Sequence, residues 1–99
     1  MPEKITDIVD EKGRIRIPRG VVPRETQSIK FRLKGKVGLG GGITSEINEE
    51  LTGNYGWMDD SLEIPEGIRK IHYIREGDVI SVELIEFITS TGERKKITA

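Results

Sequence analysis

The chain has 99 residues, of which 34% are apolar and 33% are charged, and its formal net charge is −1. This length is near the commonest domain size and too short for a second independent core, so we expect one domain spanning residues 1–99. Because the chain has no cysteine, no long apolar run and no signal-peptide pattern, disulfides and thiolate zinc sites are excluded, and we expect a cytoplasmic protein with no membrane partner.

The amino-terminal part of the chain predicts a hairpin. Residues 5–9 are a short apolar run, residues 10–13 have turn composition, and residues 14–17 alternate polar and apolar side chains. Pro18 ends the hydrogen bonding of this strand, and the glycine and proline that follow it disfavour a long helix. Residues 28–34 alternate again, which predicts a half-buried strand with one apolar face and one basic face.

The middle of the chain predicts less regular structure. Residues 35–42 contain five glycines and are expected to form a flexible connection. Residues 44–51 carry the best helix-start signal, with Thr44 or Ser45 as the N-cap, and predict one short helix at most. Residues 52–61 have loop composition.

The carboxyl-terminal part predicts strands again. Residues 68–74 fit a helical turn or a strand, and residues 79–88 are the strongest strand signal in the chain. A turn at residues 90–93 leads to a short basic strand over residues 95–98. Isoleucine occurs fifteen times and alanine once, which favours strand over helix, so the predicted fold class is mainly β with at most one or two short helices. The low Gln and Asn content beside abundant Lys, Arg and Glu is typical of a thermophile.

Charge is divided unequally along the chain. Residues 1–36 hold ten Lys or Arg against five Asp or Glu, a net of +5, whereas residues 37–99 hold six against twelve, a net of −6. One interpretation is that the two halves neutralise each other across the surface. The other is that the basic half faces a polyanion and the acidic half faces away.

A short internal repeat links the two halves. Residues 15–21 and residues 62–68 match in type at every position: apolar, charged, Ile, Pro, charged, Gly, β-branched. If the repeat reflects a duplication, it predicts a small barrel with pseudo-two-fold symmetry, because closure removes the edges that a small β-domain would expose. The first copy is basic where the second is acidic.

Two segments carry a family resemblance. Residues 9–18 (Val-Asp-Glu-Lys-Gly-Arg-Ile-Arg-Ile-Pro) resemble the opening of the AbrB/SpoVT and MazE-type swapped-hairpin domains. Residues 64–70 and 74–82 resemble the later part of the same unit, where an Ile-Pro strand end, a helical turn and a Gly-Asp turn precede the next strand. The related cradle-loop barrels, which contain two such units in one chain, accommodate this layout. The resemblance implies a small barrel or a swapped-hairpin β-domain.

The resemblance also implies a function. Members that regulate transcription bind double-stranded DNA as homodimers through arginines around the first hairpin. Carried over to this chain, that role falls to Arg14 and Arg16 on the strand and Lys12 in the turn, with Arg19 and Arg24 extending the patch. Independently, Arg can contact phosphate or guanine bidentately, and a two-stranded basic ribbon fits the major groove. The primary hypothesis is therefore a DNA-binding regulator without catalysis or cofactor.

Two other functions stay open. Tyr55, Trp57 and the acidic loop suit a non-enzymatic adaptor that binds another protein. Tyr55, Trp57 and Met58 would form its exposed contact patch, although packing over one end of the core explains them equally well. The glycine-rich loop suits a nucleotide-binding barrel, particularly if Thr44 opens a helix beside it.

The remaining chemically notable residues predict no site. No nucleophile or ligand pattern surrounds His72, which is expected to be structural and partly exposed. Asp59, Asp60 and Glu63 could hold a hard cation, but their spacing lacks an EF-hand pattern, so we expect an acidic loop and no bound metal.

Overall fold

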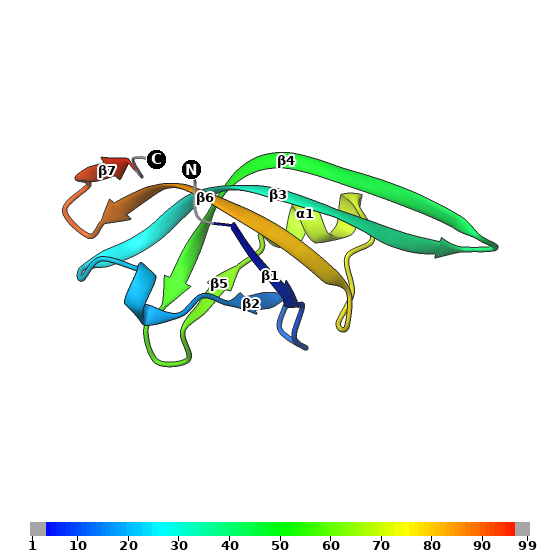
Figure 1. The fold of residues 1–99 in the computed structure, drawn as a ribbon, viewed down its shortest axis with the longest axis horizontal. Helices are drawn as coiled ribbons and strands as arrows, with labels where there is room; N and C mark the ends of the chain where they lie inside the picture. The colour runs from blue at the N-terminus through cyan, green and yellow to red at the C-terminus, as the bar shows by residue number, and fades with distance from the viewer. Residues whose placement is uncertain (1–3, 97–99) are drawn as a thin grey trace.

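The protein is mainly β, as predicted. The structure, a computed structural model, describes residues 4–96, without the side chains of Arg19, Leu39 and Lys96. The elements in chain order are β1 (Lys4–Ile8), β2 (Arg14–Arg16), the 3₁₀ turn η1 (Arg19–Val21), β3 (Thr26–Gly40), β4 (Ile43–Gly56), β5 (Ser61–Glu63), α1 (Glu66–Ile71), β6 (Val79–Thr89) and β7 (Arg94–Lys96). Figure 1 shows the short helix α1 beside two long central strands.

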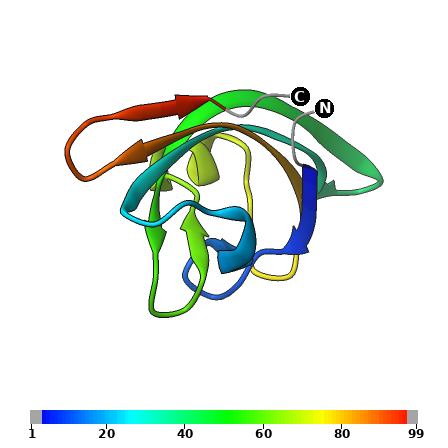
Figure 2. The same cartoon turned by 60° about the vertical axis from the view of Figure 1, so that its left-hand side comes forward.

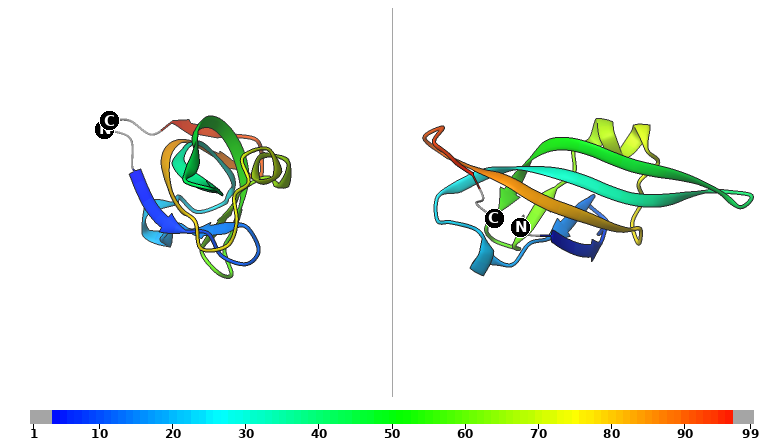
Figure 3. Two further views of the ribbon diagram at one scale, coloured as in Figure 1. Left: turned by 90° about the vertical axis from the view of Figure 1, so that its right-hand side faces the viewer. Right: turned by 45° about the horizontal axis from the view of Figure 1, so that its top comes forward.

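The strands form a nearly closed antiparallel barrel. Their hydrogen-bonded order is β1-β6-β3-β4-β5-β2, with β7 added to β6, and the ribbon curls into a ring (Figures 2 and 3). The ends of this order, β1 and β2, meet without a strand ladder. Instead Asp10 N donates to Arg14 O over 2.9 Å, and Arg16 N donates to the Asp7 carboxylate over 2.9 Å. The predicted hairpin between these segments is therefore wrong, because β1 pairs with β6 and β2 pairs with β5.

Alternation along the strands builds the core. Ile29, Phe31 and Leu33 on β3 are fully buried, while the cations between them lie on the outer face of the sheet. They pack with Ile15 on β2 and Leu84 on β6 in one apolar cluster. Burying side chains of this kind stabilises a fold by about 1.5–3 kcal/mol each, which is why the pattern of period two decides the barrel interior.

The longest strands form a hairpin that projects from the barrel (Figure 1). The predicted helix over residues 44–51 is wrong, because these residues are part of β4 and pair with β3. The predicted flexible connection over residues 35–42 is also wrong: the strand continues to Gly40, and a tight turn follows. Gly41 and Gly42 have φ of 61° and 79°, the left-handed conformations that a type I′ hairpin turn requires.

Strand β4 also changes the predicted loop. It continues to Gly56, so only residues 57–60 of the predicted loop over residues 52–61 form the turn into β5. The predicted alternative of a helical turn near residues 68–74 is realised as α1. The predicted strands over residues 79–88 and 95–98 correspond to β6 and β7, although residues 97 and 98 lie outside the described part of the chain.

The two copies of the repeat lie side by side and are related by a pseudo-two-fold axis. Ile15 and Leu62, which occupy equivalent positions in the two copies, are direct partners in the β2–β5 ladder. Two backbone bonds repeat the symmetry: Ile17 N donates to Asp60 O over 2.7 Å, and Ile64 N donates to Gly13 O over 3.1 Å. A helical turn follows the proline in each copy. The repeat therefore pairs the basic copy directly with the acidic one.

Candidate nucleic-acid interface

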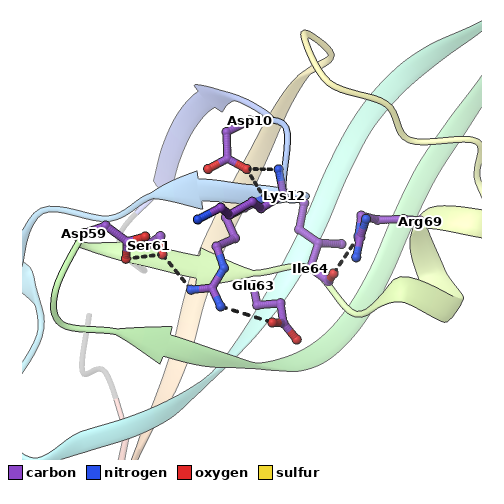
Figure 4. Close-up of polar contacts among 8 residues, drawn as sticks. Asp10, Lys12, Asp59, Ser61, Glu63, Ile64 and Arg69 are labelled. Atoms are coloured by element: carbon purple, nitrogen blue, oxygen red, sulfur yellow. Dashed lines mark hydrogen bonds and ion pairs between the residues drawn. The ribbon is translucent and has the colours of Figure 1, made fainter.

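Arg14 anchors a polar network between β2 and β5. Its Nη1 donates to Ser61 Oγ over 2.9 Å, and its Nη2 donates to Glu63 Oε2 over 3.3 Å. Ser61 Oγ in turn donates to Asp59 Oδ1 over 2.6 Å (Figure 4). Ser61 is buried, and the Arg14 side chain is 26% exposed. The network thus engages both terminal nitrogens of a half-buried guanidinium.

The pseudo-two-fold axis explains why this network forms. The β2–β5 register sets Arg14 opposite Glu63 and Arg16 opposite Ser61. Gly56 leaves room for it, since a Cβ at this position would lie 2.9 Å from both Arg14 Nη1 and Asp59 Oδ1. The β2–β5 register therefore determines which charges meet, and a glycine on the neighbouring strand β4 makes the space for them.

Asp59 is tuned by the same network. The hydrogen bond from Ser61 stabilises its carboxylate and lowers the pKa of Asp59 below its ordinary value of 3.8, and the positive charge of Arg14 acts in the same direction. Asp59 is therefore ionised throughout the physiological pH range. The acidic loop predicted from Asp59, Asp60 and Glu63 serves to partner arginines: Arg16 Nη2 lies 4.0 Å from Asp60 Oδ2. Among residues 4–96, no three His, Asp or Glu side chains form a group able to hold a metal ion.

The other predicted DNA-binding residues differ from Arg14 in the exposure and pairing of their side chains. The Arg16 side chain is 75% exposed. Lys12 and Arg24 are exposed, and neither side chain makes an ion pair or hydrogen bond with the residues that the structure describes. The Arg19 backbone lies in η1, and its side chain is outside the described part of the structure. The structure therefore leaves Lys12, Arg16 and Arg24 accessible and holds Arg14 in a network.

The basic outer face of β3 is neutralised. Lys30 Nζ lies 3.1 Å from Glu50, Arg32 Nη2 lies 3.4 Å from the same carboxylate, and Lys34 Nζ lies 2.9 Å from Glu83. The hydrogen bond from Lys34 lowers the pKa of Glu83 below its ordinary value of 4.5. On this face the first interpretation of the charge division holds: acidic residues of the second half, on β4 and β6, flank the cations of the first.

A second feature, near Lys12 and Arg24, is an uneven surface around Trp57. Three hollows share this residue and are together called the Trp57 surface. The first, of about 410 Å³, is lined by Lys12, Arg14, Gly56, Trp57, Met58 and Asp59. The second, of about 620 Å³, is lined by Val22, Arg24, Glu25 and Trp57, and the third, of about 340 Å³, by Glu25, Thr26, Gln27, Tyr55, Trp57 and Ser90. The sequence analysis singled out the aromatic residues, but it did not predict that Trp57 would line the same hollows as Lys12 and Arg24.

The aromatic residues both pack and face outward. Trp57 and Tyr55 meet edge to face with ring centroids 4.9 Å apart, and Tyr55 is buried with its hydroxyl donating to Ile17 O over 2.7 Å. Met58, in contrast, is 98% exposed. Of the two alternatives for this segment, packing is therefore confirmed for Tyr55, and the contact patch stays a prediction.

The glycine-rich segment and His72 make contacts that hold the fold together. Thr44 begins no helix, so the glycines have no helix terminus beside them, and Arg75 Nη2 donates to Gly38 O over 3.1 Å to fasten the projecting hairpin. His72 lies just beyond α1, is 15% exposed as predicted for a partly exposed structural residue, and has its Nε2 3.0 Å from Glu49 Oε1 on β4. Among residues 4–96, no helix is both long enough and apolar enough to traverse a bilayer.

Comparison with known proteins places the fold and no more. No protein-family model and no curated protein matches the chain. It is similar to the solution structure of PHS018 from the thermophilic archaeon Pyrococcus horikoshii, with 23% identity and a TM-score of 0.61 over 97% of this chain and 95% of that one. This similarity confirms a small antiparallel barrel, but it does not confirm membership of the AbrB/SpoVT family.

Proposed function

We propose that this protein is a DNA-binding regulator that contacts duplex DNA through Lys12, Arg16 and Arg24. The observation that carries the proposal is a contrast in exposure: Lys30, Arg32 and Lys34 on β3 are half-buried and lie in ion pairs, whereas Lys12 and Arg24 are exposed. Arg16 is 75% exposed although Asp60 lies 4.0 Å away. When exposed cations of a protein neutralise DNA phosphates, the counterions condensed on the DNA are released, and this release drives non-specific DNA binding. Kinship with the AbrB-like and cradle-loop barrels is part of the same proposal, supported by the paired Ile-Pro units.

In this proposal Arg14 positions the interface and does not contact DNA. Its guanidinium is already bonded to Ser61 and Glu63. Its positive charge offsets that of the Glu63 carboxylate and acts on Asp59, which lowers the repulsion that a phosphate would meet. The resemblance to the AbrB-like family assigned Arg14 to contact with DNA, so the proposal narrows the set to its exposed members.

The proposal includes a homodimer. Ile8 on β1 and Val79 on β6 are register partners, and they are 57% and 55% exposed on the outer face of the sheet. These two neighbouring exposed β-branched residues, one on the short strand β1 and one at the start of β6, form an apolar strip that a second copy could cover. Sedimentation equilibrium tests this part: the wild type is expected to sediment as a dimer and Val79→Lys as a monomer.

Fluorescence anisotropy with a random-sequence duplex tests the binding. The triple variant Lys12→Glu, Arg16→Glu, Arg24→Glu is expected to lose affinity on the order of 100-fold or more, because three phosphate contacts are lost. Six cations in a dimer predict a slope of log K against log salt of about −5, and three in a monomer about −3. For each of the three single variants the matched control is Lys36→Glu, which makes the same charge change on the projecting hairpin. Equal losses in the control and in each single variant would contradict the assigned surface.

A further inference from the structure

The projecting hairpin has a strand edge without a partner. Strand β4 pairs with β3 on one side, and on its other side β5 pairs with Tyr55 and Gly56 alone. Within residues 4–96, no backbone N–H or C=O of residues 43–48 bonds to a backbone group outside β3. The backbone groups of a strand point alternately to its two sides, so half of these residues direct a donor and an acceptor away from β3. Residues 43–48 are called the open edge.

Neither proline, lysine nor a bulge, which commonly protect a sheet edge, lies in the open edge. Its sequence is Ile-Thr-Ser-Glu-Ile-Asn, and the bulge of the hairpin is on β3, between Gly38 and Gly40. The segment just beyond α1 is fastened to β4 at Glu49, whose Oε1 lies 3.0 Å from His72 Nε2. From there the hairpin extends past α1 (Figures 1 and 3). The open edge is therefore a template for a strand of another chain.

The charge on this side of β4 favours a basic partner. Strand β4 contains three glutamates and neither Lys nor Arg. Glu49 and Glu50 have partners in the fold, whereas Glu46 is exposed and has no ion pair within the described part of the chain. An added strand lies about 5 Å from β4 and about 10 Å from β3, so Glu46 is its near neighbour and Lys36, the register partner of Glu46, is a distant one. The longer distance exceeds the screening length of about 8 Å at physiological ionic strength.

Exposed apolar side chains lie near both ends of the open edge. Ile43, at its outer end, is 63% exposed. Ile71 and Tyr73 are 67% and 62% exposed, and they flank His72, whose contact with Glu49 brings this segment to the inner end. Tyr73 has a φ of 56°, a left-handed conformation that is strained for a bulky residue, and such strain clusters at binding sites. Aromatic and aliphatic side chains of this kind serve as anchors for a partner.

We propose that the open edge binds an extended, basic peptide segment of a partner protein, which adds a strand to the hairpin. In this mode of recognition main-chain hydrogen bonds supply the affinity, and alternate side chains supply the specificity. A Lys or Arg of the peptide lies beside Glu46, and apolar residues near its ends contact Ile43 and Tyr73. The added strand also stabilises a ribbon that otherwise has two strands. This site uses none of the residues assigned to DNA and goes beyond that proposed function.

Fluorescence anisotropy of a labelled peptide, Val-Lys-Val-Lys-Val-Lys with blocked ends, tests the site on the full chain. In an extended peptide of this sequence one face is cationic and the other is apolar. Two further peptides carry N-methyl groups, one on its lysines and the other on its valines. N-methylation removes the backbone donors along one side of the peptide strand. We therefore expect one methylated peptide to lose about tenfold or more in affinity and the other to bind like the unmodified peptide.

Variants of the protein locate the peptide. Glu46→Gln should lower the affinity for the unmodified peptide by up to about fivefold, because one ion pair across two strands is lost. Its matched control is Glu11→Gln, which changes an exposed glutamate in the turn before β2 and should have no effect. Tyr73→Gly removes the ring at a position whose backbone conformation suits glycine, so it should weaken binding while the circular dichroism spectrum is unchanged.

Several results would overturn this inference and leave the proposed duplex binding intact. They are the absence of binding at millimolar peptide and low salt, equal affinities of the two methylated peptides, and equal effects of Glu46→Gln and Glu11→Gln. Sedimentation equilibrium gives a further test: if saturating peptide dissociates the protein, a second copy occupies the open edge, and the assignment to a partner protein is overturned.

Discussion

The β2–β5 layer and the outer face of β3 carry the same kinds of charged residue, but they place them in different surroundings. Between β2 and β5, Arg14 is 26% exposed and bonds to the buried Ser61 and to Glu63. On β3, Arg32 is 36% exposed and lies 3.4 Å from Glu50, which is 41% exposed. The difference teaches that a charged strand is not by itself an interface, since its neighbours in the sheet decide whether its charges are available.

The largest expected difference between the two regions is the effect on stability of adding a side chain where two strands pack closely. A Cβ at Gly53 on β4 would collide with the carbonyl oxygen of Glu63, whereas one at Gly38 on the projecting part of β3 meets nothing within 4 Å. We expect Gly53→Ala to lower the free energy of unfolding by about 3 kcal/mol, because backbone must shift, and Gly38→Ala to change it by less than about 1 kcal/mol. Urea denaturation of both variants measures the difference; equal stabilities would contradict the packing of β4 against β5.

Removing one arginine from each region should have a smaller effect of the same sign. Arg14→Met leaves the buried Ser61 and the Glu63 carboxylate without their donor, so we expect a loss of about 1–2 kcal/mol in unfolding free energy. Arg32→Met removes a solvent-screened pair and should cost less than about 0.5 kcal/mol. Thermal unfolding by calorimetry at matched pH compares them, and a larger loss for Arg32→Met would reverse the proposed ranking.

The smallest effects concern proton binding. In the folded protein the pKa of Asp59 lies below 3.8 because Ser61 donates to the carboxylate, so the folded state holds this proton less readily than the unfolded chain. The interaction therefore stabilises the fold above pH 3.8, and this contribution is lost as the pH falls through the lowered value. We expect Ser61→Ala to return the pKa of Asp59 toward its ordinary value and to flatten the loss of stability in acid.

Carboxyl resonances followed by NMR titration measure this shift directly. The matched change in the other region is Lys34→Met, which should raise the pKa of Glu83 without affecting that of Asp59. An unchanged pKa of Asp59 in Ser61→Ala would show that the hydrogen bond is not the dominant cause.

Local patterns predicted the strands that alternate strongly. Residues 28–34 and 79–88 lie in β3 and β6, because an apolar residue at every second position leaves only one face to bury. The same reasoning failed at residues 44–51, whose N-cap signal favoured a helix. Their pairing with β3 overrides that preference, since twelve register pairs along the hairpin satisfy the backbone of both strands.

The site was predictable only in part. Lys12, Arg16 and Arg24 were marked by charge density and by resemblance, and they remain exposed. The engagement of Arg14 was not predictable, because it depends on a partner 49 residues away in the chain. The hollows beside Trp57 are likewise lined by segments that are distant in sequence, and no local pattern predicts that these segments come together.

By itself, the sequence determined that this protein is a small, cysteine-free, mainly β fold with two related Ile-Pro units of opposite charge. Those properties depend on local periodicity and composition, which the chain carries in every conformation. Only the tertiary structure decided that the two units pair with each other across a pseudo-two-fold axis, so that one copy's acids neutralise some of the other's cations. The interaction between two charged groups depends on the distance between them, and for groups far apart in the sequence this distance is set by folding.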